Sequence, residues 1–198
     1  MSELGPSPLA AGDLNLSVAD ARAAIAAALR PITDSETLPL VRSLGRVLAA
    51  DVVSPIDVPA HDNSAMDGYA FDGRALADGT PTVLKVAGSV FAGTPFSGTV
   101  AAGDCVRIMT GAVMPAGLDT VVPQELCRAD SDRVSIEPGV IKPGENRRRR
   151  GEDLSAGKPA LQAGRVLKPA DLGLIASLGI GSVTVLRRLR VALFSTGN

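Results

Sequence analysis

The sequence predicts a mainly β protein with a few helices, an α+β fold in which a helix-and-strand domain carries an inserted small β-barrel or sandwich domain. Composition is one reason: the 198 residues include 21 glycines and 14 prolines but only 3% aromatic residues. Such a composition favours short strands and many turns over a helical bundle. The other reason is that short apolar runs, separated by Gly, Pro and Asp, fill residues 58–141, whereas helical periodicity is confined to the flanking segments.

The N-terminal part predicts one helix. Apolar residues recur at helical spacing from Val18 to Leu29, Ser17 can cap the start, and Pro31 prevents continuation. The preceding residues 1–16 lack the basic start and apolar stretch of a secretory signal, and we expect a flexible N-terminus there.

The next segment, "ETLPLVRSLGRVLAADVV", predicts a strand around residues 38–41, a helical turn around 43–48 and a strand that ends at Pro55. Four runs, "TVLKVAGSV", "CVRIM", "DTVVP" and "RVSIE", then predict strands of the inserted domain. A second helix is predicted in "KPADLGLIASLGIG", with Pro169 in its first turn and Gly179 just after its end.

The last residues, "LRVALFSTGN", have the near-continuous apolar pattern of a buried parallel strand. We therefore expect residues 186–198 to be the first strand of a truncated α/β domain. Ser195, Thr196 and the Gly197 amide would then lie at the carboxyl end of that strand, where α/β proteins bind ligands.

The expected domain organisation is discontinuous. The segments on either side of the β-rich region are too small to bury separate cores, so they should pack on each other. Residues 17–57 and 142–185 then form a first domain, and residues 58–141 form a second, inserted domain.

Charge and residue usage exclude several classes of protein. The formal net charge is −1, and the shortage of aromatic residues also argues against a nucleic-acid-binding barrel. The longest apolar run, residues 172–180, is about half the length of a membrane span. Cys105 and Cys127 have no metal-ligand spacing and are expected to be reduced thiols, and the single histidine, His61, has no ligand partner. The prediction is a soluble, cytoplasmic protein without membrane or nucleic-acid partners.

The segment "DVPAHDNSAMDGYAFDG" concentrates polar chemistry and has two interpretations. In one, it is a turn-rich loop in which Asp62 and Asn63 form Asx-turns and Gly68 has a positive φ. In the other, the loop lies at the rim of a cleft, where Asp67 orients a basic residue, a Mg²⁺ ion or a water. The rim residues of that second interpretation are Ser64, Met66 and Asp67.

A second motif, "RIMTGAVMP", places a hydroxyl and a glycine directly after a predicted strand. The Thr110 hydroxyl and the amides of Gly111 and Ala112 could point at one anionic oxygen, as backbone nests do. The alternative is a simple turn in which Thr110 bonds its own backbone. Gln124 and Glu125 could face the same cleft.

A third motif, "NRRRRGED", sets Arg147, Arg148, Arg149 and Arg150 beside acidic residues. Arginine offers a rigid fork of donors that matches phosphate or a tetrahedral oxyanion. Alternatively, two of the four arginines pair with acids such as Glu152 and Asp153 while two lie in solvent. The sequence leaves both interpretations open.

Four blocks occur in one order along the chain: "DVVSPIDVPAHDNSAMDGYA", "VRIMTGAVMPAGLDTVVPQE", "NRRRRGEDLSAG" and "LRVALFSTGN". Together they resemble the MoeA-type molybdopterin molybdenumtransferases, bacterial relatives of the gephyrin E-domain, in their N-terminal part only. The resemblance implies insertion of molybdate into adenylated molybdopterin with Mg²⁺, which releases molybdenum cofactor and AMP. It also implies an elongated homodimer whose active cleft lies between the second domain of one subunit and the third domain of the other.

The resemblance implies roles for individual residues. Asp67, Thr110 and Asp153 are the expected catalytic residues, and the two aspartates are also candidates for binding Mg²⁺. The expected substrate-binding residues are Ser64, Met66, Gly111, Arg147 and Arg149. Because the third and fourth domains are absent from this sequence, we expect the chain alone to show no molybdenum insertion. The alternative function is a dimer-forming, cleft-closing interaction module without catalysis of its own.

Overall fold

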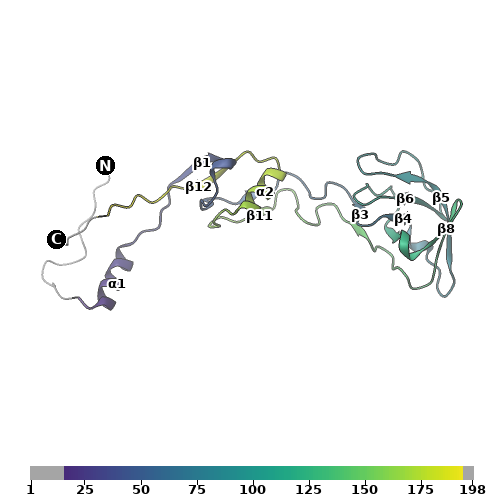
Figure 1. Cartoon of the computed structure of the whole chain (residues 1–198), viewed down its shortest axis with the longest axis horizontal. Coiled ribbons are helices and arrows are strands. Elements are labelled where there is room, and N and C mark those ends of the chain that lie inside the picture. The colour runs from purple at the N-terminus through teal and green to yellow at the C-terminus, as the bar shows by residue number, and fades with distance from the viewer. Residues whose placement is uncertain (1–15, 194–198) are drawn as a thin grey trace.

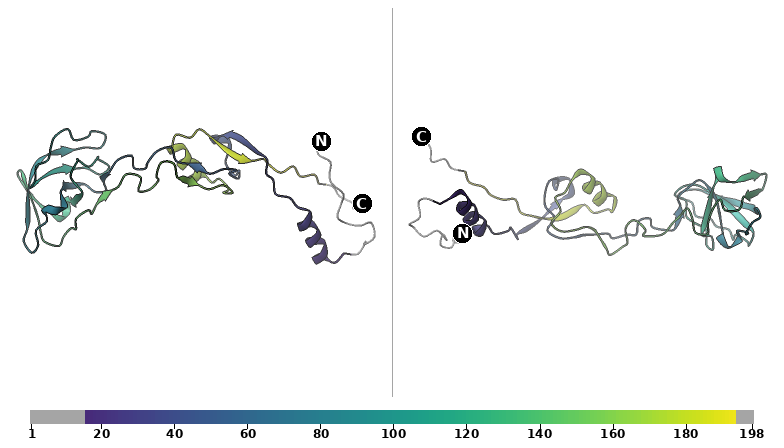
Figure 2. Two further views of the ribbon diagram at one scale, coloured as in Figure 1. Left: turned by 180° about the vertical axis from the view of Figure 1, so that it is seen from behind. Right: turned by 90° about the horizontal axis from the view of Figure 1, so that it is seen from below.

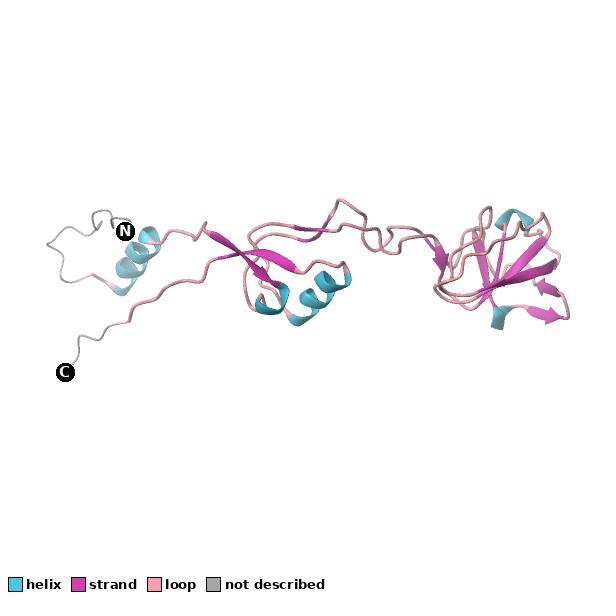
Figure 3. Cartoon of the chain, turned by 90° about the horizontal axis from the view of Figure 1, so that it is seen from above, coloured by secondary structure: helices cyan, strands magenta, loops and turns pink. Residues whose placement is uncertain are grey.

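A computed structural model describes residues 16–193 and shows an elongated molecule (Figure 1). A curled six-stranded sheet lies at one end, a smaller unit containing α2 lies in the middle, and α1 lies near the other end. Views from behind, below and above show the same separation, with two lengths of chain running between the sheet and the central unit (Figures 2 and 3). The fold class is as predicted, mainly β, and the described part of the chain contains two α-helices.

The N-terminal helix, α1, spans Val18–Ala28, as predicted to within a residue. The Ser17 hydroxyl accepts a hydrogen bond from the Asp20 amide at 3.1 Å and so caps the helix. No residue of α1 is buried, and Ile25 is 61% exposed.

The central unit joins segments from both ends of the chain. Strand β1 (Ser35–Pro39) pairs antiparallel with β12 (Ser182–Leu186), and β2 (Val52–Val53) pairs with β11 (Pro159–Leu161). The buried residues of its core are Leu40, Leu48, Val52, Leu161, Leu167, Ile175, Val183 and Val185. Segments more than 100 positions apart in the sequence therefore share one hydrophobic core.

Two elements of this unit start earlier than predicted. Strand β1 spans Ser35–Pro39, whereas the prediction was residues 38–41. A 3₁₀ turn follows at Leu40–Arg42, whereas the predicted helical turn was at 43–48. The Ser43 hydroxyl donates to the Leu40 carbonyl at 2.7 Å, and this bond closes the turn before the predicted position.

Helix α2 spans Pro169–Ser177 and agrees with the prediction. Pro169 is in the first turn, and Gly179 has φ +75°, a left-handed conformation that glycine adopts without strain. The Asp171 carboxylate accepts from the Lys168 amide at 2.8 Å and pairs with Arg165 at 2.8 Å. No helix within the described residues has the length and hydropathy needed to cross a membrane.

The six-stranded sheet has the strand order β7-β4-β6-β5-β9-β8. Its strands are β4 (Gly68–Phe71), β5 (Thr82–Val90), β6 (Asp104–Ile108), β7 (Thr120–Pro123), β8 (Arg128–Asp130) and β9 (Arg133–Ile136). The four runs predicted as strands are β5, β6, β7 and β9. Only β5 and β6 run parallel, and the other neighbours are antiparallel.

Apolar side chains cover both faces of this sheet, which is why it can curl around a core. One cluster contains Ala70, Val90, Val106, Ile108, Ala112, Met114, Leu118 and Val121. The other contains Phe71, Leu84, Cys105, Val122, Val134, Ile136 and Ile141. Because both clusters hold the strands in place, the loops that join the strand ends are also held in place.

A short ribbon begins the sheet end of the molecule. Strand β3 (Asn63–Ser64) pairs antiparallel with β10 (Arg147–Arg148). This pairing brings the polar loop before β4 next to the arginine run. The division of the chain into residues 17–57 with 142–185 and 58–141 remains a prediction.

The C-terminal part of the chain differs from the prediction. Strand β12 ends at Leu186, and residues 187–193 form no strand, although a strand was predicted from 186 onward. No strand within residues 16–193 pairs with them, so their backbone lacks the ladder partner that a strand requires. Ser195, Thr196 and Gly197, together with nearly all of the predicted flexible N-terminus, lie outside the described residues.

Candidate functional site

Asp67 and Thr110 come together at one end of the sheet. Asp67 lies between β3 and β4, and Thr110 lies two residues beyond β6. One carboxylate oxygen of Asp67, Oδ1, accepts hydrogen bonds from the Thr110 hydroxyl at 2.6 Å and from the Thr110 amide at 2.7 Å. These two bonds, together with the positive charge of Arg107, lower the pKa of Asp67 below its ordinary value. An exposed carboxylate is thus held ionised at a fixed position.

The loop after Thr110 is closed by the protein's own groups. The Gly111 amide donates to the Ser64 carbonyl at 2.8 Å, and the Ala112 amide donates to the Met109 carbonyl at 2.9 Å. With the Thr110 hydroxyl donating to Asp67, all three groups predicted to face an anion are already engaged. The structure therefore differs from the predicted nest, because Asp67, Ser64 of β3 and the Met109 carbonyl each accept one of these donors.

Ser64 and Met66 have different environments. Ser64 is buried, and its hydroxyl donates to the Met66 carbonyl at 2.6 Å while accepting from the Met66 amide at 3.2 Å. Ser64 therefore shapes the loop, as Ser-centred turns do. The Met66 side chain is exposed next to Asp67.

The arginine run divides between ion pairs and solvent. The Arg148 guanidinium pairs with Asp153 and with Glu152, the latter at 3.7 Å. Arg150 Nε donates to Asp57 Oδ2 at 2.6 Å. With Arg147, which lies 3.7 Å from Asp62, three of the four arginines pair with acids, whereas the second interpretation expected two paired and two in solvent.

Arg147 and Arg149 remain less engaged. Arg147 Nε lies 3.7 Å from Asp62 Oδ2 and is buried without a hydrogen-bond partner. The Arg149 guanidinium makes no ion pair within residues 16–193, although its amide donates to Glu152 at 2.9 Å. Of the predicted substrate-binding residues, Arg149 has the most available cationic group.

The described residues do not form a magnesium site. Among residues 16–193, no three His, Cys, Asp or Glu side chains gather in a way that could hold a metal ion. Asp67 is bonded to Thr110, and Asp153 is paired with Arg148. The two predicted Mg²⁺ candidates are each engaged with another residue, and neither has a neighbouring ligand set.

Two local predictions for the polar loop were wrong. Gly68 has no positive φ; glycine is required there because a Cβ atom would lie 2.0 Å from the Val122 carbonyl oxygen. Asp62 forms no local turn bond and instead accepts from the Arg150 amide at 2.8 Å. In both cases the partner lies far along the chain, and a turn pattern does not encode such a partner.

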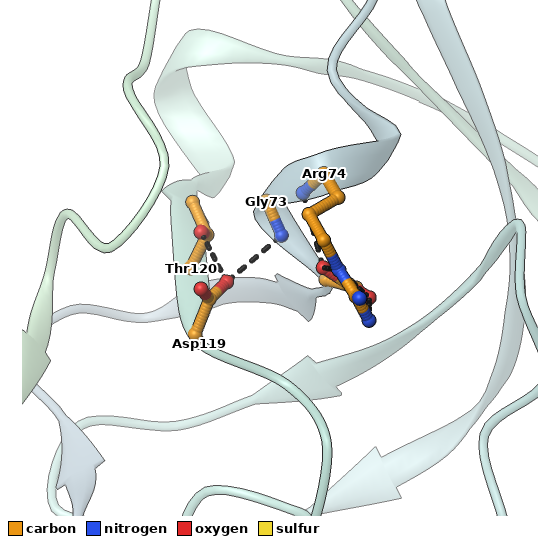
Figure 4. Close-up of polar contacts among 5 residues, drawn as sticks. Gly73, Arg74, Asp119 and Thr120 are labelled. Atoms are coloured by element: carbon orange, nitrogen blue, oxygen red, sulfur yellow. Dashed lines mark hydrogen bonds and ion pairs between the residues drawn. The ribbon is translucent and has the colours of Figure 1, made fainter.

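Sequence reasoning also missed a polar contact at the far side of β4. Figure 4 shows the Asp119 carboxylate between Thr120 and Gly73: Oδ1 accepts from the Gly73 amide at 2.8 Å and from the Thr120 hydroxyl at 2.7 Å. Thr120 Oγ1 in turn accepts from the Gly144 amide at 2.8 Å. These bonds join three separate loops, and the sequence signal for them was limited to one Asp-Thr pair at a strand start.

The chain is similar to known proteins of one family. The model of the MoeA N-terminal region (domain I and II) matches residues 16–179. The chain is 44% identical to a molybdopterin molybdenumtransferase of Haemophilus influenzae over 84% of its length, and 42% identical to molybdopterin molybdenumtransferase 2 of Mycobacterium tuberculosis over 86%. These matches cover 41% and 42% of the relatives, so the chain spans about two fifths of their length.

The fold agrees with solved structures. A crystal structure of a molybdopterin biosynthesis MoeA protein from Pyrococcus horikoshii superposes with a TM-score of 0.71 at 34% identity, covering 78% of this chain and 41% of the other. A second structure from the same species has a TM-score of 0.68 at 30% identity. Because the family model covers most of the residues and the fold agrees, the chain belongs to the MoeA N-terminal region family.

Proposed function

We propose that this chain acts in molybdenum cofactor biosynthesis, as the N-terminal part of a molybdopterin molybdenumtransferase. The reaction is insertion of molybdate into adenylated molybdopterin, with release of AMP. The observation that carries the proposal is 44% identity to a protein of that name over 84% of this chain. The ionised Asp67 held by Thr110, beside an arginine-rich loop, supports it.

The substrates explain the chemistry of the loops. Molybdate and the adenylate are anions, so positioning and charge stabilisation carry more of the reaction than a protein nucleophile does. The guanidinium of Arg149, and that of Arg147 beside it, bind an anionic oxygen. Asp67 orients a donor or a water, with Thr110 fixing the carboxylate. Asp153 sets the position of Arg148.

Other parts of the proposal concern the assembly and its setting. The chain works as part of a cytoplasmic homodimer, with the third domain of the other subunit completing the cleft at the Asp67 side. We derive no step through Mg²⁺, because the described residues do not gather a ligand set for it. Residues 58–141 act as the cleft-forming domain and residues 17–57 with 142–185 as the stem.

A chimera tests this function. Residues 16–179 of this chain replace the matching segment of the Haemophilus influenzae relative, and molybdenum insertion is measured as AMP release and cofactor formation. We expect an active chimera, and we expect Asp67→Ala and Asp153→Ala to reduce its activity strongly with little change in melting temperature. The exposed Asp130→Ala in β8 is the matched control. An inactive but folded chimera would contradict the proposal.

The second candidate is an interaction module, favoured by the engaged donors of Thr110, Gly111 and Ala112. The chimera variants distinguish the two, because both candidates give the same expectation for the 198-residue chain alone. We expect it to fold without measurable insertion. If Asp67→Ala and Asp153→Ala leave the chimera fully active, the chain serves association only.

A further inference from the structure

One face of the six-stranded sheet carries the exposed Ser89 and Arg107 and the half-buried Tyr69 next to the Asp67 and Thr110 pair. The register places Tyr69 of β4 opposite Arg107 of β6, and Arg107 opposite Ser89 of β5. Residues opposite each other on neighbouring strands project from the same face. These three side chains therefore form one row across three strands, while Ala70, Val106, Ile108 and Val90 are buried on the other face.

Phe91 extends this row at its open end. It directly follows Val90, the last residue of β5, its backbone forms an isolated bridge with Thr94, and it is 56% exposed. The Met109 amide donates to the Val90 carbonyl at 3.2 Å, which holds the chain at Phe91 beside the residue that precedes Thr110. An exposed aromatic ring thus borders the loop that fixes Asp67.

Arg107 supplies a positive charge at the same place. It is exposed and makes no ion pair within residues 16–193. Its charge acts on the Asp67 carboxylate, so the guanidinium lies within electrostatic reach of Asp67. The face therefore combines a flat apolar ring with an unpaired group that can bind an anionic oxygen.

We propose that Phe91 and Arg107 form a subsite for a planar heteroaromatic ring that carries a phosphate. The ring stacks on Phe91, and the phosphate oxygens are bound by Arg107. The shared chemistry is that of a pterin phosphate or an adenylate. The choice of these two compounds rests on the proposed function, whereas the subsite itself rests on the sheet register and on the exposure of the two side chains.

The test measures binding to the purified 198-residue chain. The probes are 6-hydroxymethylpterin, its monophosphate and AMP, followed by pterin fluorescence or by calorimetry; the chain contains no tryptophan that would interfere. We expect Phe91→Ala to weaken the binding of the pterin and of its monophosphate about tenfold, since stacking on an aromatic ring has this order of effect. Arg107→Gln should weaken the binding of the phosphorylated probes about tenfold and leave the binding of the unphosphorylated pterin unchanged. Phe91→Trp, measured by calorimetry because it introduces a tryptophan, should retain binding.

Matched controls separate binding from folding. Val83→Ala removes an apolar side chain of similar exposure, 54%, from the other end of β5, and Arg133→Gln removes an exposed arginine from β9. Both should bind all probes as the unchanged chain does, and circular dichroism should show every variant folded. Tighter binding of AMP than of pterin monophosphate, with the same dependence on Phe91, would support the subsite and assign it to adenine.

Two results would overturn the subsite: no saturable binding of any probe, or equal affinity of the Phe91→Ala variant and the unchanged chain. Failure of the proposed function looks different. If the chimera inserts no molybdenum while the chain binds the probes through Phe91 and Arg107, the reaction is wrong and the subsite stands. If the chimera is active and Phe91→Ala binds normally, the function stands and the subsite is wrong.

Discussion

The carboxylate of Asp67 accepts both the hydroxyl and the amide of Thr110, at 2.6 and 2.7 Å, although the two residues are 43 positions apart. The two bonds join the loop before β4 to the loop after β6. They also hold Asp67 ionised, because hydrogen bonds to the charged form lower a carboxyl pKa. This contact links the fold of the sheet to the chemistry of the candidate site.

Replacing Thr110 should release Asp67. In Thr110→Val the hydroxyl bond is lost, so the pKa of Asp67 should rise toward its ordinary value, while Thr110→Ser keeps the hydroxyl and the low pKa. Carboxyl carbon chemical shifts followed by NMR between pH 2 and about 6 measure this. The same Asp67 pKa in the unchanged chain and in the Val variant would show that the hydroxyl bond does not hold the carboxylate.

The low pKa of Asp67 also has a consequence for stability. A carboxyl whose pKa is lower in the folded state stabilises that state above the unfolded pKa, and this contribution is lost as the pH falls through the folded pKa. The unchanged chain should therefore lose more stability than the Asp67→Asn variant between about pH 4 and more acid pH. Urea unfolding at pH 7, 4 and 3 gives the free energy of unfolding of both proteins. An equal loss of stability in the two proteins would contradict the prediction.

Gly68→Ala should destabilise the chain. A Cβ atom would lie 2.0 Å from the Val122 carbonyl oxygen, so β4 and β7 must separate locally, a distortion that costs about 1–3 kcal/mol or more. Gly173→Ala in α2 is the control of opposite sign. Nothing lies within 4 Å of a Cβ there, and alanine should stabilise the helix by about 0.5–1 kcal/mol. Denaturant unfolding gives both values, and equal effects would refute the steric reason.

The ion pair between Arg150 and Asp57 should contribute to stability in a salt-dependent way. Asp57 accepts hydrogen bonds from Arg150 Nε at 2.6 Å and from the Ala156 amide at 2.8 Å. Both bonds lower the pKa of Asp57, and the bond from the Ala156 amide has the larger effect. Arg150→Gln should lower the melting temperature at low salt and less so in 1 M NaCl, because salt screens the pair. Arg149→Gln, next in the chain, should have little effect at either salt concentration. A salt-independent loss would mean that packing is lost instead.

Cys105 should be inert toward thiol reagents in the folded chain. It is fully buried, and burial raises its pKa to about 12, so almost no thiolate exists at pH 8. Ellman's reagent at pH 8 should modify Cys105 only after unfolding, which mass spectrometry of the labelled peptides can show. Rapid labelling of Cys105 in the folded chain would contradict its burial. Cys127, which is half-buried, should react first.

The raised pKa of Cys105 predicts a loss of stability in alkali. The folded chain keeps this proton at pH values where the unfolded chain releases it, so stability falls as the pH rises from the unfolded pKa, about 8.5, toward 12. Cys105→Ala lacks the titrating group. Its stability should fall less between pH 8 and 10.5, and equal slopes for the two proteins would exclude Cys105 as a source of the effect.

The sequence by itself determined the elements whose signals are local. Ser17 and Pro31 bound α1, Pro169 and Gly179 bound α2, and four apolar runs became strands of the sheet. Capping, backbone restriction and strand periodicity act over a few residues, so a pattern in the sequence is enough to locate them. The order of four motif blocks likewise identified the family, because the blocks are read directly from the chain.

Only the tertiary structure decided the partners of the polar residues. The sequence left the arginine run open, but folding brings Arg150 to Asp57, 93 positions away, and its amide to Asp62, 88 positions away. The fold likewise brings the Val122 carbonyl to the place where a side chain at position 68 would lie, and it brings the Ser64 carbonyl to the Gly111 amide, which donates to it. Such contacts depend on strand order and register, which are properties of the whole chain, and no local pattern of residue types specifies which donor meets which acceptor.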